Sequence, residues 1–147
     1  MKKKEKILKI LNYLKKLHNE NKTYNYNNKI SENKIIENLN YFMFGSVETL
    51  VMATIYVEKI GGININTTLW SLCLLCNKLY DDDFEIVNYL VTSHEIDEYH
   101  KFEKMFLTEI NWKTHINRDT YVDIKKKYII DKKKIFLEKL VVLIKYV

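Results

Sequence analysis

The chain has 147 residues, a length that favours one domain with a single hydrophobic core. Hydrophobic residues make up 47% of it and aromatic residues 13%, which excludes an intrinsically disordered chain. With three glycines and no proline, it lacks the residues that sheets joined by tight turns need, so the composition favours an all-α fold.

The formal charge of +5 is carried almost entirely by lysine, and Arg118 is the only arginine. The lysines are concentrated near the ends of the chain, in "MKKKEK", "KKKY" and "DKKK". Proteins that read nucleic acids use arginine for bidentate contacts, so we do not expect this chain to bind them. We interpret the lysines as solvated helix faces and a compositional bias.

Two cysteines and the lack of a signal peptide favour an intracellular protein of the nucleus or cytoplasm. The longest apolar run, "IFLEKLVVLI", is interrupted by charge and is too short to span a bilayer. We therefore expect no membrane-spanning segment.

The first predicted helix covers residues 2–19, and the polar segment "NENKTYNYNNK" after it is a predicted linker. The helix has lysines opposite one apolar stripe, which predicts a peripheral helix packed on the domain. A basic amphipathic helix could also bind a membrane surface or a partner's groove. The stripe consists of Ile7, Leu8, Leu11, Leu14 and Leu17. Residues 1–30 form this first region.

Two helices should follow, separated by a break at Gly45-Ser46. Ser31 is the expected N-cap of the first. Ser46 is the expected N-cap of "VETLVMATIYVEKI", which should end at Gly61-Gly62 because glycine adopts left-handed geometry. The core face of the first helix should be Ile35, Ile36, Leu39 and Phe42.

The next helix, "LWSLCLLCNKLY", is apolar nearly all round, which is typical of a helix buried by neighbours on every side. Thr67 or Thr68 should cap it. Asp83 should cap a short helix, "FEIVNYLV", and a longer helix should start near Ser93 or Glu95 and end near residue 111. Further helices are predicted over residues 118–130 and 132–147.

The residues that could hold a metal or carry out catalysis have simpler explanations. Cys73 and Cys76 lie three apart in the buried helix and are expected in the core. The four histidines are scattered and expected at the surface. Three consecutive aspartates, from Asp81 to Asp83, cannot share one helix face and suit a helix N-terminus. We expect no metal, cofactor or catalytic site.

Lys78 and Glu103 are charges set among apolar neighbours. Lys78 follows Trp70 and Leu74 along one row, and Glu103 shares a face with Tyr99 and residues 106–107. The two side chains could extend to solvent, pair with each other, or form part of a binding site.

From "VETLVMATIYVEKI" through "TEINW" the chain resembles a cyclin box, and it is most similar to the single-box P/U-type cyclins. Those cyclins carry a "KF-x-DD" segment on the central helix, where this chain has "CNKLYDD". They carry "E-x-x-x-L-E-x-x-F-L" on the fifth helix, where it has "EYHKFEKMFL". The resemblance covers residues 31–118 and implies a five-helix cyclin box, with residues 119–147 as a helical extension.

The resemblance implies a regulatory subunit rather than an enzyme. Its partner would be a cyclin-dependent kinase, bound as a heterodimer and activated when the cyclin holds the kinase αC helix inward. The family's lysine and glutamate hydrogen-bond the backbone near the start of that helix, and apolar neighbours line the same groove. Carried over to this chain, the kinase-binding residues are Lys78, Leu79, Glu103, Leu107 and Trp112.

The chain departs from the family in several places. Leu79 replaces an aromatic residue, and "NKIIENL" stands where mitotic cyclins have the substrate-docking "MRAIL". Glu58 stands near the family's "DRF" aspartate, with Lys34 as a candidate partner. Two rival functions stay open: a cyclin-fold nucleic-acid module, as in general transcription factor IIB, and a scaffold that binds a kinase without activating it.

Overall fold

Two apolar helices, α3 (Ser46–Ile60) and α4 (Ile65–Tyr80), form the centre of the molecule. The computed structural model describes residues 2–24, 30–41, 45–129 and 140. Over these residues it shows helices and one isolated bridge between His18 and Ile63, but no β-strand. The expectation of an all-α fold is confirmed for this part of the chain. No helix within it is both long and apolar enough to cross a bilayer.

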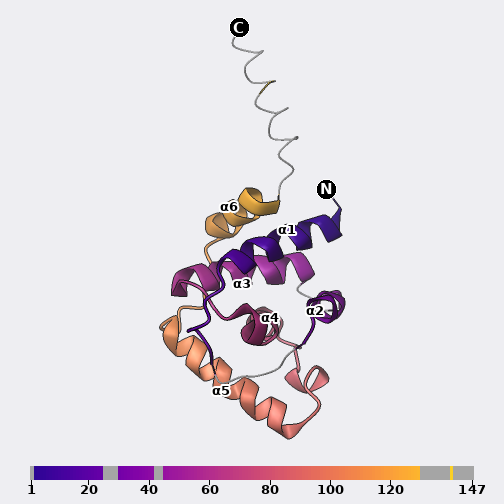
Figure 1. Cartoon of the computed structure of the whole chain (residues 1–147), viewed down its shortest axis with the longest axis vertical. Helices are drawn as coiled ribbons and strands as arrows, with labels where there is room; N and C mark the ends of the chain where they lie inside the picture. The colour runs from indigo at the N-terminus through magenta and orange to yellow at the C-terminus, as the bar shows by residue number, and fades with distance from the viewer. Residues whose placement is uncertain (1, 25–29, 42–44, 130–139, 141–147) are drawn as a thin grey trace.

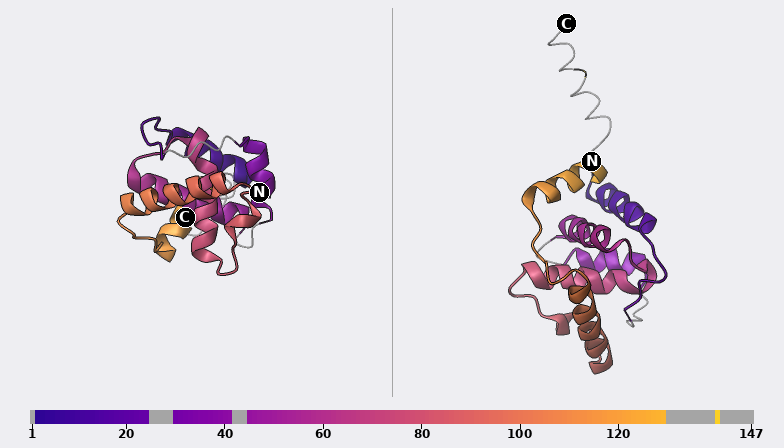
Figure 2. Two further views of the ribbon diagram at one scale, coloured as in Figure 1. Left: turned by 90° about the horizontal axis from the view of Figure 1, so that it is seen from below. Right: turned by 90° about the vertical axis from the view of Figure 1, so that its left-hand side faces the viewer.

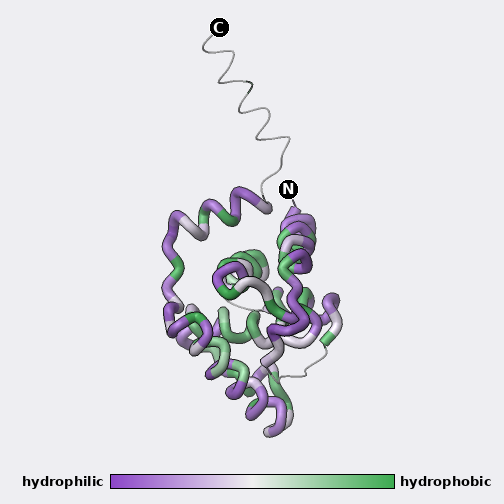
Figure 3. The backbone as a smooth tube through the Cα atoms, turned by 60° about the vertical axis from the view of Figure 1, so that its left-hand side comes forward, coloured by the Kyte–Doolittle hydropathy of each residue, from purple (hydrophilic) through white to green (hydrophobic). Residues whose placement is uncertain are grey.

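The remaining helices cover α3 and α4. They are α1 (Lys3–Lys16), α2 (Glu32–Leu39), α5 (Ser93–Glu109) and α6 (Arg118–Ile129). In Figure 1, α4 lies at the centre, α1 and α6 lie beyond α3 at one end, and α5 lies at the other. The right-hand view of Figure 2 shows the same order. Hydrophobic segments lie mainly toward the middle of the molecule (Figure 3).

The core forms because α3 and α4 have no polar face. Every residue from Thr49 to Val57 and from Thr68 to Asn77 is buried. Cys73 and Cys76 are fully buried, which confirms the prediction that they are core residues. The final predicted helix, residues 132–147, lies outside the described residues except for residue 140.

Helix α1 contributes to this core on a slightly different stripe from the predicted one. Ile7, Leu11 and Leu14 are buried as expected, but Ile10 takes the place of Leu8, whose side chain is 40% exposed. The buried residues of α1 and α3 belong to one continuous core, so α1 is an integral part of the bundle.

Glycines mark the junctions between helices, as expected. Gly61 is left-handed, with φ of 77°, and ends α3. At Gly62 a Cβ atom would overlap the Leu17 carbonyl oxygen. The segment after α1 can therefore pack this closely only if residue 62 is a glycine. The backbone N–H of Ile63 donates to that same carbonyl at 3.2 Å.

The helix caps were predicted less well than the helices. Ser31 is the N-cap of α2, as expected, and its hydroxyl accepts from the Lys34 backbone N–H at 3.3 Å. The prediction for α3 was wrong by one residue, since Gly45 is the N-cap and Ser46 is the first helical residue. Helix α5 begins at Ser93, and Thr92, which we had not predicted, accepts from the Glu95 N–H at 3.1 Å.

The predicted start of α4 was also wrong. The helix begins at Ile65 rather than after Thr67 or Thr68. The side chain of the N-cap residue, Asn64, makes no capping hydrogen bond. Instead, the imidazole Nδ1 of His18 accepts from the Ile65 backbone N–H at 3.1 Å. A residue 47 positions away therefore satisfies one of the donors that a helix N-terminus leaves free.

The three aspartates end α4 instead of starting a helix. The Asp81 backbone N–H donates to the Asn77 carbonyl at 2.8 Å, and its carboxylate accepts from the Asp83 N–H at 3.0 Å. The predicted helix "FEIVNYLV" is reduced to one 3-10 turn, η1 (Ile86–Asn88). An aspartate that accepts from the backbone two residues ahead stabilises a turn, which explains why no helix starts here.

The candidate pair of Lys34 and Glu58 was wrong. Lys34 lies 3.9 Å from Glu37 on its own helix, and Glu58 accepts a hydrogen bond from the hydroxyl of Tyr13. Glu58 therefore joins α3 to α1 rather than to α2.

We predict that His18→Ala lowers the free energy of unfolding by about 1 kcal/mol, as loss of an N-cap does. The measurement is urea denaturation followed by circular dichroism. His94→Ala is the matched control, because His94 is exposed in the first turn of α5. Equal stability of the two variants would show that the His18 contact does not cap α4.

We also predict that neither cysteine reacts in the folded protein. Burial raises the pKa of Cys73 to about 12 and raises that of Cys76 well above its ordinary value. Because the thiolate is the reactive form, iodoacetamide at about pH 8 should leave both thiols unmodified, by mass spectrometry. Unfolding in guanidinium should restore normal alkylation. Rapid alkylation of the native chain would contradict the buried positions.

Candidate functional site

The structure brings Lys78 and Glu103 together at the surface. Lys78 lies in the last turn of α4, and its Nζ donates to the two carboxylate oxygens of Glu103 at 2.8 and 3.0 Å. The side chains are 38% and 20% exposed. The Lys78 Nζ also lies 5.9 Å from the ring centroid of buried Tyr99, within the range of a cation–π contact.

Packing determines where this ion pair lies. Trp70 and Leu74 occupy the same row of α4 as Lys78 and are buried. This row of side chains therefore becomes accessible to solvent only at Lys78, in the last turn of the helix. Of the sequence-based alternatives, mutual pairing is the one that the structure shows. An ammonium group has three N–H donors, so two carboxylate contacts leave Lys78 one donor for a further acceptor.

Leu79 and Leu107 differ in accessibility. Leu79 is half-buried and packs against the core from the end of α4. Leu107 is only 5% exposed and belongs to the core itself. Its backbone carbonyl accepts from the Trp112 N–H at 2.7 Å, so Leu107 supports the position of Trp112.

Trp112 is held outward by an unusual backbone. Asn111 and Trp112, just after α5, have φ values of 57° and 60°, both left-handed. This conformation is rare for bulky residues and costs roughly 1–2 kcal/mol relative to the right-handed one. The Trp112 side chain is nevertheless 62% exposed, so core packing does not explain why a tryptophan occupies the position. A strained, exposed aromatic residue is a candidate binding residue.

The ends of α4 and α5 are joined through Thr114. Its carbonyl accepts from the hydroxyl of Tyr80, the last residue of α4, at 3.0 Å and from that of Tyr56 at 2.5 Å. Its own N–H donates to the Trp112 carbonyl at 3.1 Å. Tyr80 is itself 43% exposed. Trp112 therefore lies one tight turn from a residue anchored to the end of α4.

We use the name α4–α5 surface for the accessible residues that these contacts join: Lys78, Leu79, Tyr80, Glu103 and Trp112. Glu103 and the end of α5 are six residues apart, about 9 Å along a helix. The surface thus combines a charge pair, a half-buried aliphatic side chain and two exposed aromatic rings within reach of one partner element. Of the predicted residues, only Leu107 lies beneath it.

Sequence reasoning missed the contacts that position α5 from the other side. Tyr24, only 4% exposed, donates its hydroxyl proton to one Glu109 carboxylate oxygen, and Lys22 pairs with the other. Burial and the hydrogen bond that its hydroxyl donates to Glu109 raise the pKa of Tyr24 above its ordinary value. The partners are more than 80 positions apart and follow no common periodicity, so no local pattern in the sequence points to them.

No family model, no curated protein and no solved structure matches this chain. What the surface can do must therefore be argued from its own residues.

We predict that Trp112→Gly stabilises the protein by about 0.5–1 kcal/mol, since glycine removes the left-handed strain but adds chain entropy to the unfolded state. Trp112→Ala keeps the strain and serves as the matched control. Thermal denaturation of both variants gives the comparison. A glycine variant less stable than the alanine variant would show that the backbone strain is absent. An alanine variant much less stable than the original chain would show that the indole ring contributes to folding, and the case for a binding role would be lost.

Proposed function

We propose that this chain is a cyclin-like regulatory subunit that binds a cyclin-dependent kinase through the α4–α5 surface. One observation carries the proposal. Lys78 of α4 and Glu103 of α5, which are 25 positions apart in the sequence, meet at the surface next to Leu79, and exposed Trp112 follows the end of α5. These are the residues that the resemblance to cyclins marks for contact with a kinase.

The chemistry of the surface suits the end of a partner helix. The last turn of a helix leaves carbonyls without partners, and the first turn leaves N–H groups. The spare N–H of Lys78 can donate to such a carbonyl, and the Glu103 carboxylate can accept from an N–H. Apolar residues beside the pair exclude water and strengthen these hydrogen bonds. Trp112 has the large, rigid side chain that interface hot spots favour.

On this proposal the chain contributes no catalytic group. It would activate its partner by binding one position of the kinase αC helix better than the other, and so shift the population toward the active state. A scaffold that holds the kinase without activating it would use the same surface. Measuring kinase activity with and without the chain separates these two outcomes.

The test begins with affinity purification from the source cell, followed by binding measurements with the recovered kinase. Lys78→Glu and Glu103→Ala should each cost about 2–5 kcal/mol of binding free energy, because each leaves a desolvated charge without its partner. Each should cost less stability, about 0.2–1 kcal/mol, as expected for a partly exposed ion pair. Isothermal titration and thermal denaturation measure the two effects separately.

A charge swap gives the decisive control. The double variant Lys78→Glu/Glu103→Lys restores the intramolecular pair but exchanges the donor and acceptor that face the partner. It should regain the stability of the original chain and still bind weakly. Lys101→Glu makes the same charge change on the exposed side of α5, where Lys101 pairs with Glu98 at 3.1 Å, and should bind normally. Full binding by the charge-swapped variant would show that the pair serves only to join α4 to α5.

A further inference from the structure

The charges of this chain are separated along the molecule. Residues 2–16 carry seven lysines and one glutamate, and residues 118–129 carry three lysines, one arginine and two aspartates. Together these two segments have a net charge of +8, more than the +5 of the whole chain. Residues 81–98 carry seven acidic residues and no lysine or arginine.

The fold places the two basic segments side by side. Tyr13 of α1 and Tyr128 of α6 stack with ring centroids 3.6 Å apart. Lys127 lies 4.9 Å from the centroid of the Tyr128 ring. In Figures 1 and 2, α1 and α6 are neighbours at one end of the bundle. The sequence alone could not show this, because the two segments are about 100 positions apart.

A row of lysines runs along α1 on the same side as Tyr13. Residues 2, 6, 9, 13 and 16 recur every three or four positions and so lie on one face of the helix. Of the four lysines in the row, only Lys6 is half-buried and the other three are exposed. Lys126 and Lys127 of α6 are also exposed. We define the basic face as Lys2, Lys6, Lys9, Tyr13, Lys16, Lys126, Lys127 and Tyr128.

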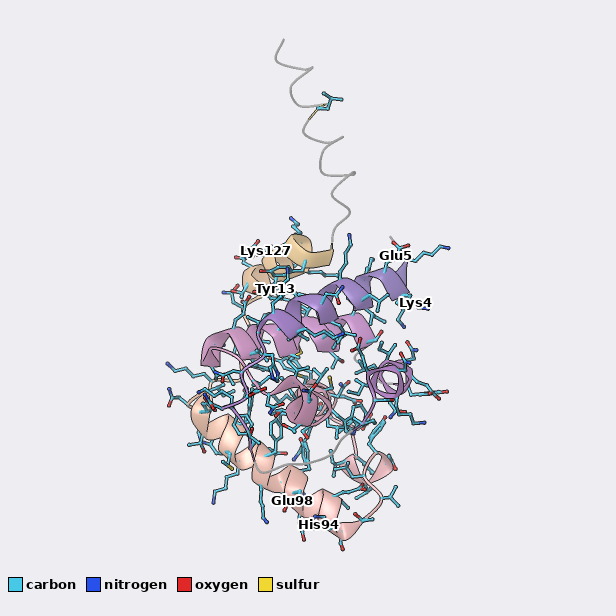
Figure 4. The ribbon with its side chains drawn as sticks, in the orientation of Figure 1. Lys4, Glu5, Tyr13, His94, Glu98 and Lys127 are labelled. Carbon is cyan, nitrogen blue, oxygen red and sulfur yellow. The ribbon has the colours of Figure 1, made fainter. Side chains whose placement is uncertain are left out.

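The acidic segment lies at the opposite end of the molecule. In Figure 4, His94 and Glu98 are far from Tyr13 and Lys127. A compositional excess of lysine explains how many lysines the chain has, but not why residues 81–98 have none. This separation of charge gives the molecule a positive end that attracts polyanions and a negative end that repels them.

We propose that the basic face binds the phosphodiester backbone of a nucleic acid without reading its sequence. Lysine supplies point charges that suit phosphate, and the shortage of arginine is no obstacle when bases are not read. The half-buried tyrosine pair joins the two lysine-bearing helices, so their charges act on one partner together. This proposal uses helices other than those of the α4–α5 surface and does not depend on kinase binding.

A membrane fits this face less well. An amphipathic helix binds a bilayer by inserting its apolar side, and the apolar side of α1 is committed to the core. Ile7, Ile10, Leu11 and Leu14 are all buried, which leaves only Leu8 exposed among the leucines and isoleucines of the helix. The face is therefore charged and aromatic, without a hydrophobic part that could enter lipid.

The test is fluorescence anisotropy of the full chain with a labelled oligonucleotide, single-stranded in one arm and duplex in the other. Binding should be detectable at low salt, and the logarithm of the binding constant should fall linearly with the logarithm of salt concentration. The variant Lys9→Gln/Lys16→Gln/Lys126→Gln should bind at least about tenfold more weakly. For single strands, the slope of the logarithm of the binding constant against the logarithm of salt concentration should become less steep by about 2. This is the change expected for three lost phosphate contacts.

The matched control is Lys101→Gln/Lys104→Gln/Lys113→Gln, which removes the same charge from exposed positions away from the basic face. It should change affinity by less than about threefold, and circular dichroism should show both variants folded. Equal weakening by both variants would overturn the proposal, since total charge alone would then explain binding. So would binding to phosphatidylserine vesicles but not to oligonucleotides. Salt-sensitive self-association through the basic face, with no oligonucleotide bound, would assign the face to a second copy of the chain.

Discussion

The packing of α3 against α4 is the constraint on which the rest of the structure depends. Neither helix has a polar face, so each must be covered on all sides before the chain can be stable in water. Helices α1 and α6 cover α3, and α5 covers α4. The remaining helices can therefore keep polar outer faces. The α4–α5 surface lies where α5 meets the end of α4, and the basic face lies where the covering helices α1 and α6 meet.

One polar contact holds the two central helices in register. The Asn77 side chain is fully buried and donates to the Thr49 hydroxyl at 3.1 Å and to the Cys73 carbonyl at 2.9 Å. Apolar packing tolerates sliding better than a buried amide does, because a shift would leave the amide without its partners. Asn77 directly precedes Lys78, so the contact that fixes the register also fixes where α4 presents its lysine to Glu103.

Features set by local periodicity could be predicted from the sequence, whereas features set by distant contacts could not. Burial of Cys73 and Cys76 follows from a helix that is apolar all round, and the end of α3 follows from Gly61. The start of α4 depends on His18, which is distant in sequence. For Lys78 and Glu103, the pattern showed two charges on apolar helices, but only the crossing of α4 and α5 decides that they meet. The left-handed backbone at Trp112 could not be predicted, because tryptophan normally avoids that conformation and nothing in the sequence marks the exception.

The basic face and the α4–α5 surface lie on separate layers of the bundle. The basic face belongs to α1 and α6, which pack on α3, while the other surface is formed where α4 meets α5. Helix α3 lies between them, so one partner at each surface would not compete for the same residues. Coupling between the two surfaces through the core would pass through the α3–α4 interface, and interiors of this kind are close-packed and resist small displacements. The architecture is therefore compatible with both proposed partners at once, because a polyanion on the basic face would leave Lys78, Glu103 and Trp112 accessible to a protein partner.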